Sequence, residues 1–170
     1  MNAIYPGSFD PITNGHINIA RRSAAVFGQL VIAVLDNPHK TPMFSVDERV
    51  AMLREVFCDE KNIEVDAFSG LLAEYAQKKN IQVIIRGLRG SDDLGNELPY
   101  AVWNRQLSAG LANSLETVYF TAEPELAYIS GSIVREVASH IYARGLDDEI
   151  ITQAVPPVVR AALREKYNAL

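Results

Sequence analysis

The alternation of strand-like and helix-like segments is the feature of this sequence that most constrains its fold. Short apolar runs, typical of buried parallel strands, occur at residues 3–5, 30–35, 63–68, 83–85 and 118–121. Segments with helical periodicity occur at residues 15–27, from 45 onward, 71–79, after residue 90 to about 113, from Ser130 or Ser132 to about 142, and 156–167. Residues 45–48, Ser-Val-Asp-Glu, predict a capping box at the start of the second segment, because the serine hydroxyl accepts from an unpaired N–H and the glutamate reaches back. Parallel strands joined by helices require right-handed crossovers. The pattern therefore predicts an α/β fold with a Rossmann-like, doubly wound, five-stranded parallel sheet.

Length and composition fit a single soluble domain. The 170 residues are 48% hydrophobic and 22% charged, and no linker, repeat or low-complexity segment divides them. We expect one domain over residues 1–170, with a C-terminal helical portion from about residue 130. The net charge of −5 argues against broad binding to nucleic acid or to anionic membranes.

The sequence also bears on the cellular compartment. The single cysteine, Cys58, cannot form an intramolecular disulfide, and its apolar-periodic position predicts packing within a helix. No apolar run approaches membrane-spanning length, and the first residues lead directly into a strand, which leaves no room for a signal peptide. These features predict a cytoplasmic protein that binds no membrane.

The turn between the first strand and the first helix has the composition of a phosphate-binding loop. It reads Tyr-Pro-Gly-Ser-Phe-Asp-Pro-Ile-Thr-Asn-Gly-His over residues 5–16. Glycine lets a backbone approach a ligand closely, and a helix N-terminus offers unpaired N–H groups to an anion. His16 falls in the first turn of the helix, where it can donate to a phosphoryl oxygen, and Asp10 is expected to organise the loop. The alternative interpretation is a structural turn in which His16 has no chemical role.

Basic residues follow two further strands. Lys40 comes after the second strand, and Arg86 and Arg89 flank Gly87-Leu88 after the fourth. Because ligands of doubly wound sheets bind at the carboxyl ends of the strands, we expect these side chains and the loop at residues 5–16 to meet at one edge. Ammonium and guanidinium groups at that edge suit phosphate oxygens.

Each of these cations also has a structural interpretation. Taken alone, Lys40 is typical of a solvated loop lysine. The two arginines can instead form salt bridges with acidic residues downstream, namely Asp92, Asp93 or Glu97.

The stretch Ile-Ser-Gly-Ser-Ile-Val-Arg that ends at Arg135 is a further candidate anion site. Ser130 and Ser132 stand at the expected start of a helix, where their hydroxyls and nearby N–H groups either bind a phosphate or only cap the helix. Arg135 lies one turn inside, and a salt bridge to Glu136 or Asp147 is its competing role.

Together these motifs carry a resemblance to a known family. Thr13-Asn14-Gly15-His16 resembles the T/H-x-G-H signature of the nucleotidylyltransferase superfamily. Gly7-Ser8-Phe9-Asp10-Pro11 and Ile85-Arg86-Gly87-Leu88-Arg89 look like the phosphopantetheine adenylyltransferase branch of that superfamily. The stretch at residues 129–135 resembles its I-S-S-[ST]-x-x-[RK] motif. The resemblance runs from about residue 4 to residue 135, with the motifs in the family's order and spacing.

The resemblance implies transfer of the adenylyl group of ATP to 4′-phosphopantetheine, giving dephospho-coenzyme A and pyrophosphate in coenzyme A biosynthesis. It also implies Mg²⁺ as the cofactor, a homohexamer built as a dimer of trimers, and feedback inhibition by coenzyme A. Because the substrate phosphate is itself nucleophilic, we expect direct in-line displacement, with the protein orienting the reactants and stabilising charge. No carboxylate cage for a metal is evident, which fits magnesium held by phosphates and water.

The resemblance also assigns residues to the site. The expected catalytic residues are His16, as transition-state stabiliser, Lys40 and Arg89. The expected contacts to 4′-phosphopantetheine are Ser8, Lys40, Leu72 and Arg86. The expected contacts to ATP are Ser8, Phe9, His16, Gly87, Leu88, Arg89, Glu97, Leu126, Ala127, Tyr128, Ile129, Ser130, Gly131 and Ser132. Tyr100 and Trp103 have no role there and are expected to pack or to contact another subunit.

Several positions depart from the family pattern. Gly131 stands where serine is common, which removes one hydroxyl donor, and Leu126 stands where an aromatic residue is common. Pro99 suits the first turn of a helix better than its interior, so the sequence predicts that the helix starts near Leu98. Glu97 would then point differently from its counterpart in relatives.

Two rival functions compete with this interpretation. Adenylyl transfer to nicotinamide mononucleotide, or cytidylyl transfer to a small alcohol phosphate, shares the signatures at His16 and at residues 130–135. Neither by itself predicts Lys40 together with the motifs at residues 7–11 and 85–89. A nucleotide-binding regulator would keep the pocket without turnover, and fold alone does not separate it from an enzyme.

Overall fold

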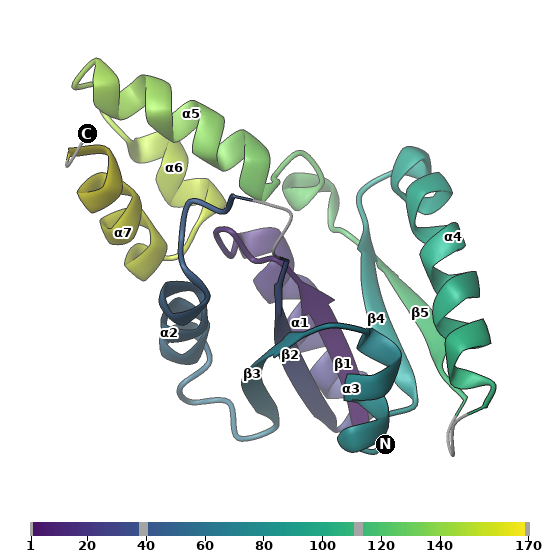
Figure 1. Ribbon diagram of the computed structural model, residues 1–170. Coiled ribbons are helices and arrows are strands. Elements are labelled where there is room, and N and C mark those ends of the chain that lie inside the picture. The colour runs from purple at the N-terminus through teal and green to yellow at the C-terminus, as the bar shows by residue number, and fades with distance from the viewer. Residues whose placement is uncertain (1, 38–40, 111–113, 169–170) are drawn as a thin grey trace.

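The framework of the protein is a five-stranded sheet, seen in a computed structural model that describes residues 2–37, 41–110 and 114–168 (Figure 1). The strands are β1 (Asn2–Gly7), β2 (Gln29–Asp36), β3 (Ile63–Ser69), β4 (Val83–Leu88) and β5 (Glu116–Thr121). They lie in the order β3-β2-β1-β4-β5, and each neighbouring pair is parallel. The predicted doubly wound parallel sheet is therefore confirmed, and its winding reverses between β1 and β4.

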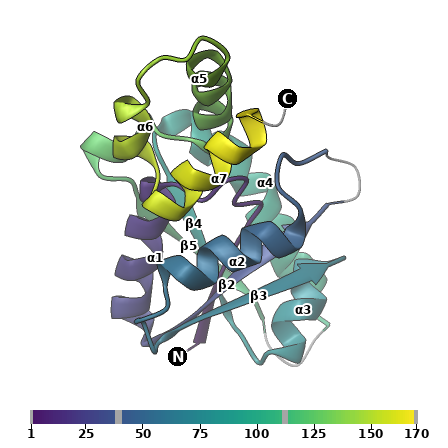
Figure 2. The ribbon, with the colours of Figure 1, turned by 90° about the vertical axis from the view of Figure 1, so that its left-hand side faces the viewer.

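Helices cover both faces of the sheet. The helices are α1 (Asn14–Phe27), α2 (Val46–Val56), α3 (Leu72–Lys78), α4 (Ser91–Ser108), α5 (Gly131–Ala143), α6 (Glu149–Ala154) and α7 (Pro157–Asn168). Figure 2 shows α1 and α3 on opposite sides of the sheet, and α4 packs beside α3. Alternation along β1 feeds both cores, because Ala3 and Tyr5 belong to the core under α1 and α2 while Ile4 belongs to the core under α3.

Local capping fixes where α2 begins. Ser45 Oγ accepts a hydrogen bond from the Glu48 backbone N–H at 3.2 Å, and Glu48 Oε2 accepts one from the Ser45 N–H at 2.7 Å. This is a capping box, in which two otherwise unpaired donors at a helix start are satisfied by two side chains. The capping box expected from the sequence is confirmed.

The start of α4 differs from the sequence prediction. The helix begins at Ser91 and contains Pro99 in its interior, so the predicted start near Leu98 is wrong. Proline leaves the carbonyl four residues earlier without its N–H partner. That residue, Gly95, is exposed, so water can donate to the carbonyl in place of the helix backbone.

Other local expectations also need correction. Strand β4 continues to Leu88, so Arg86 and Gly87 lie within the strand and not in a loop after it. The short helix α6 and the 3₁₀ turn η1 (Pro124–Leu126) were not predicted. Cys58 is exposed and follows the end of α2, so the packing role predicted for it is wrong. Among the described residues, no helix combines the length and the apolar character needed to cross a membrane.

The last three helices form a layer at the end of the sheet toward which the strands run (Figure 1). A buried carboxylate, that of Asp148, holds them together. Arg160 and Arg164 each donate two hydrogen bonds to it at 2.7–3.0 Å, and the Tyr142 hydroxyl donates a further one at 2.9 Å. These hydrogen bonds, chiefly those from Arg160 and Arg164, hold the pKa of the Asp148 carboxyl well below its usual range.

We expect Asp148→Asn to loosen this helical layer. The amide keeps only one of the two acceptor oxygens and loses the negative charge, which leaves donors of α7 without partners and lowers Tm by several degrees in a thermal scan. Glu136→Gln is the control, because Glu136 is exposed on α5 and its side chain has no role in this network. Equal Tm values for the two variants would show that Asp148 does not hold the layer together.

Candidate active site

The predicted convergence at one sheet edge occurs at the point where the winding reverses. Strands β1 and β4 are parallel neighbours, so the loop that follows Gly7 and the segment that follows Leu88 open on the same edge. The structure thus brings Ser8 and His16 to the edge that also receives Arg89. Lys40, which was predicted to follow β2 at this edge, lies outside the described residues.

Asp10 organises the phosphate loop, as expected from the sequence. Its carboxylate accepts hydrogen bonds from the backbone N–H groups of Met43, at 3.0 Å, and Phe44, at 2.9 Å. The same carboxylate lies 3.3 Å from Arg135 Nη1 of α5, which also donates to the Asp10 carbonyl. Arg135 is therefore paired with Asp10, and neither Glu136 nor Asp147 is its partner. One side chain thus ties the loop to the start of α2 and to α5.

His16 is held as a neutral imidazole with a defined tautomer. Its Nδ1 accepts a hydrogen bond from the Thr13 backbone N–H at 3.1 Å, so the proton of the neutral ring lies on Nε2. Thr13 Oγ1 in turn accepts from the His16 N–H at 3.4 Å, which makes the pair a capping box at the start of α1. Burial, aided by the positive charge of Arg89, lowers the pKa of His16 to about 4. At neutral pH, Nε2–H is a donor without a positive charge.

Both predicted arginines are paired with carboxylates of α4. Arg89 donates to Asp93 through Nε at 2.9 Å and Nη2 at 2.8 Å, and these hydrogen bonds lower the pKa of the Asp93 carboxyl. Arg86 Nε lies 3.3 Å from Glu97 Oε2, and its Nη1 donates to the Pro6 carbonyl at 3.4 Å. The salt bridges considered as an alternative are therefore present, and they hold the guanidinium groups at the edge of the site.

The start of α5 faces the phosphate loop. Ser130 caps the helix by accepting from the Ile133 N–H at 3.3 Å, and its hydroxyl lies 3.1 Å from that of Ser132. The capping role is thus confirmed, while the backbone N–H groups of Gly131 and Ser132, at the first two positions of the helix, lie before the first carbonyl that the helix itself can offer them. These groups keep the capacity to bind an anion.

The contact between α5 and the phosphate loop explains why residue 131 is a glycine. A Cβ on Gly131 would lie 3.1 Å from the Asp10 carbonyl oxygen and 3.3 Å from that of Pro11. Such distances are tighter than nine in ten real Cβ contacts, so the loop backbone would have to move by a few tenths of an ångström. Glycine therefore lets α5 approach the phosphate loop more closely than the serine common at this position would.

The remaining predicted contacts are distributed unevenly around this edge. Phe9 and Ile129 are buried, and Phe9 packs edge-on against the His16 ring at 5.3 Å. Leu72, at the start of α3, is partly buried against the core under that helix, and the residues of the phosphate loop belong to the other core. A Cβ on Gly87 would overlap the Cδ1 of Ile19 of α1, so the end of that isoleucine side chain would have to shift. Leu88 is partly buried at the end of β4, and Leu126 and Ala127 are partly buried beside the exposed Tyr128.

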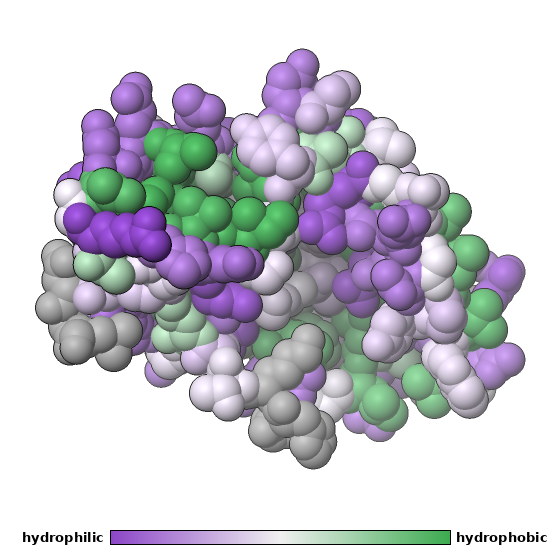
Figure 3. Space-filling model, turned by 90° about the horizontal axis from the view of Figure 1, so that it is seen from above, coloured by the Kyte–Doolittle hydropathy of each residue, from purple (hydrophilic) through white to green (hydrophobic). Residues whose placement is uncertain are grey.

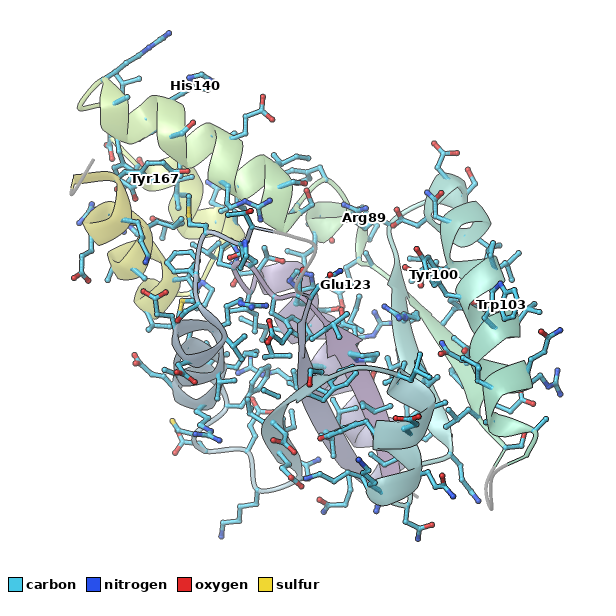
Figure 4. The ribbon with its side chains drawn as sticks, in the orientation of Figure 1. Arg89, Tyr100, Trp103, Glu123, His140 and Tyr167 are labelled. Carbon is cyan, nitrogen blue, oxygen red and sulfur yellow. The ribbon has the colours of Figure 1, made fainter. Side chains whose placement is uncertain are left out.

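The surface around the site is mixed in character. Seen from above, hydrophobic residues gather on the side that carries α5 to α7, and hydrophilic residues lie between that side and α4 (Figure 3). Figure 4 shows Arg89 beside the start of α4, with Tyr100 and Trp103 further along that helix. Tyr100 is 64% exposed and Trp103 62%, so neither packs into the core. Within the described part of the chain, no group of three or more His, Cys, Asp or Glu side chains could hold a metal ion.

One further residue at this edge escaped sequence reasoning. Arg49 of α2 is 2% exposed and donates to the Ser8 carbonyl at 2.7 Å. The sequence contained no signal for it, because an arginine within a helical segment is ordinarily on the surface.

Comparisons with known proteins relate this chain to enzymes that transfer nucleotidyl groups. A family model described as cytidylyltransferase-like matches residues 4–137. The phosphopantetheine adenylyltransferase of Caldanaerobacter subterraneus subsp. tengcongensis is 44% identical over 166 residues, covering 98% of this chain and 97% of the relative. The phosphopantetheine adenylyltransferases of Carboxydothermus hydrogenoformans, 43% identical over 98% of this chain and 96% of the relative, and Alkaliphilus metalliredigens, 42% identical over 96% and 97%, are also similar.

A solved structure supports the fold. The crystal structure of the lipopolysaccharide core biosynthesis protein from Thermoplasma volcanium superimposes with a TM-score of 0.52, covering 72% of this chain and 98% of that chain. The two sequences are 18% identical, so this likeness concerns the fold alone.

The state of His16 can be tested by NMR. We expect the imidazole ¹⁵N signals, assigned by comparison with His16→Gln, to show the proton on Nε2 at pH 7 and to titrate with a midpoint of about 4. Because this pKa lies below the ordinary value of 6.5, the unfolded state binds the proton more readily, and stability falls as the pH falls from about 6.5 to about 4. A midpoint near 6.5, or a proton on Nδ1, would contradict the site geometry.

The close contact at Gly131 predicts a cost for the serine common there. We expect Gly131→Ser to lower the free energy of unfolding by about 1 kcal/mol, because the new Cβ displaces the phosphate loop or α5. Gly95→Ser is the control, since a Cβ at that position meets no atom within 4 Å. Urea denaturation of both variants measures the difference, and a Gly131→Ser protein as stable as the parent would refute the packing argument.

Proposed function

Because this chain belongs to the phosphopantetheine adenylyltransferase family, we propose that it transfers the adenylyl group of ATP to 4′-phosphopantetheine by direct in-line displacement. A phosphate oxygen of 4′-phosphopantetheine attacks the α-phosphorus of ATP. The bond from that phosphorus to the oxygen bridging to the β-phosphorus breaks, and pyrophosphate leaves. The products are dephospho-coenzyme A and pyrophosphate.

The geometry of His16 is the observation that carries the proposal. Its neutral ring has the proton on Nε2, and the Thr13 N–H fixes the orientation of the ring. A preoriented donor at the start of α1 can stabilise the charge that grows on the α-phosphoryl oxygens, at no cost of reorganisation during the reaction. The acceptor is already an anion, so the protein need not supply a nucleophile or a general base.

Charged and polar groups on either side of His16 suit the two substrates. Ser8, Arg86 and Lys40 are proposed to hold the acceptor phosphate. Arg89 and the start of α5, with Ser130 and Ser132, suit the β- and γ-phosphates. For phosphates to bind, they must compete with Asp93 and Glu97 for the two arginines.

Magnesium is proposed as the cofactor. When bound, Mg²⁺ neutralises charge on the leaving pyrophosphate. The residues present fit an ion held chiefly by phosphate oxygens and water, because the described part of the chain offers no cluster of protein ligands. The chain's own contribution on that side is the guanidinium of Arg89 and the hydroxyls that begin α5.

We also propose a cytoplasmic enzyme that assembles as a homohexamer, a dimer of trimers, and that coenzyme A inhibits. The exposed Tyr100 and Trp103 of α4 support subunit contact, because aromatic side chains are enriched in interfaces. Coenzyme A contains the pantetheine phosphate unit, so the acceptor groups named above would bind it as well.

The reaction is tested by pyrophosphate release from ATP and magnesium with 4′-phosphopantetheine or nicotinamide mononucleotide as the acceptor. We expect release only with 4′-phosphopantetheine, together with a product of the mass of dephospho-coenzyme A. Release only with nicotinamide mononucleotide would overturn the acceptor but keep the chemistry. Binding of ATP without turnover of either acceptor would point to a regulator.

The role of His16 has its own test. We expect His16→Ala to lower kcat about 10²- to 10³-fold, because a preoriented hydrogen-bond donor to the transition state is lost, while ATP binding measured by calorimetry changes little. His140→Ala is the matched control, because His140 is exposed on α5. A loss of ATP binding as large as the loss of turnover would contradict a role specific to the transition state.

A further inference from the structure

We propose that Arg49 is a positioning residue for the acceptor-phosphate half of the site. Its guanidinium, which lies beneath the phosphate loop, fixes Ser8 and the start of α2 and adds positive potential where the phosphate of 4′-phosphopantetheine binds. This inference rests on the proposed acceptor.

The contacts of Arg49 join three segments. Its Nη1 donates to the Ser8 carbonyl of the phosphate loop at 2.7 Å and to the Leu35 carbonyl near the end of β2 at 3.3 Å. Its Nε donates to the carbonyls of Phe44 at 3.0 Å and Ser45 at 3.3 Å, just before α2. Ser8 itself is exposed, so its carbonyl is held from inside while its hydroxyl remains available to a ligand.

The charge of Arg49 is uncompensated. All of its partners among the described residues are backbone carbonyls, and none of the described carboxylates lies within ion-pair distance of it. Burying a cation without a counter-ion is costly, and a neutral donor could bind a carbonyl with a smaller penalty. The cost is explained if an anion binds nearby. The substrate phosphate is that anion.

Arg49 and Asp10 hold the same segment from two sides. Phe44 donates its N–H to Asp10 and accepts at its carbonyl from Arg49, so the backbone that follows residues 38–40 is fixed to the phosphate loop at both polar groups. Asp10 does not neutralise Arg49, because its carboxylate is paired with Arg135. Arg49 therefore couples the loop of Ser8 to the segment through which Lys40 joins α2.

The nucleotide half of the site does not depend on Arg49. Arg89 is held by Asp93, and Ser130 is held by the backbone of its own helix. None of these groups contacts Arg49. Loss of Arg49 should therefore weaken binding of 4′-phosphopantetheine much more than binding of ATP.

The test compares Arg49→Lys and Arg49→Met with a control on the same helix, Arg54→Met, which removes an exposed arginine. Lysine keeps the charge, but its single nitrogen cannot reach all four carbonyls that the planar fork of the arginine spans. We expect KM for 4′-phosphopantetheine to rise about tenfold in Arg49→Lys and further in Arg49→Met, while KM for ATP stays within about twofold. Arg54→Met should leave both KM values unchanged.

A binding measurement separates positioning from general loss of structure. We expect the ratio of Kd for 4′-phosphopantetheine to Kd for pantetheine, which lacks the phosphate, to rise in the Arg49 variants, because only the phosphate contacts are lost. Equal increases in KM for both substrates, or an unchanged Kd ratio, would overturn the inference even if Tm falls. If Arg49→Met does not fold, Arg49→Lys decides alone, and parental KM values in that variant would overturn the inference. Failure of the parent enzyme to use 4′-phosphopantetheine would instead refute the proposed function.

Discussion

The carboxylate of Asp10 is the interaction on which the rest of the site depends. It joins the loop after β1 to the backbone that begins α2, through Met43 and Phe44, and to α5 through Arg135. Three elements that are far apart in sequence thereby meet around the start of α1. Because Asp10 is buried, its hydrogen bonds compete little with bulk water, and loss of Arg135 would leave its buried carboxylate without a counter-ion.

Around this carboxylate, the protein arranges charge before any substrate arrives. His16 is fixed in one tautomer by Thr13, and the two arginines of the β4 end are held by Asp93 and Glu97. Partly exposed ion pairs of this kind are worth little in free energy. A multiply charged phosphate can therefore take over the arginines with little loss, and find them already oriented. Such preorganisation is what a reaction without a protein nucleophile requires from an enzyme.

The sequence predicted the features that depend on local pattern. Apolar runs gave the five strands, and the serine and glutamate at residues 45 and 48 marked the start of α2. The position of Arg86 and Arg89 after a buried run predicted that they reach the edge of the sheet beside His16.

Features that depend on contacts between distant segments could not be predicted in this way. The pairing of Arg135 with Asp10 spans 125 residues, and nothing near either residue signals it. Arg49 was missed because burial of an arginine follows from what covers it and not from its neighbours in sequence. Pro99 misled the prediction for α4, because a proline is tolerated inside a helix whose freed carbonyl faces water. Gly131 was interpreted as a lost donor, whereas its packing against the Asp10 and Pro11 carbonyls is what the structure requires.

The stereochemical course at the α-phosphorus tests the central claim most directly. ATP that carries sulfur at the α-phosphorus in one configuration would be turned over with 4′-phosphopantetheine, and the configuration of the phosphorothioate in the product would be determined by ³¹P NMR. A single in-line displacement inverts the configuration, and inversion is the result this account predicts. Retention would mean two displacements through an adenylylated side chain, and would contradict a site that works by orientation and charge alone.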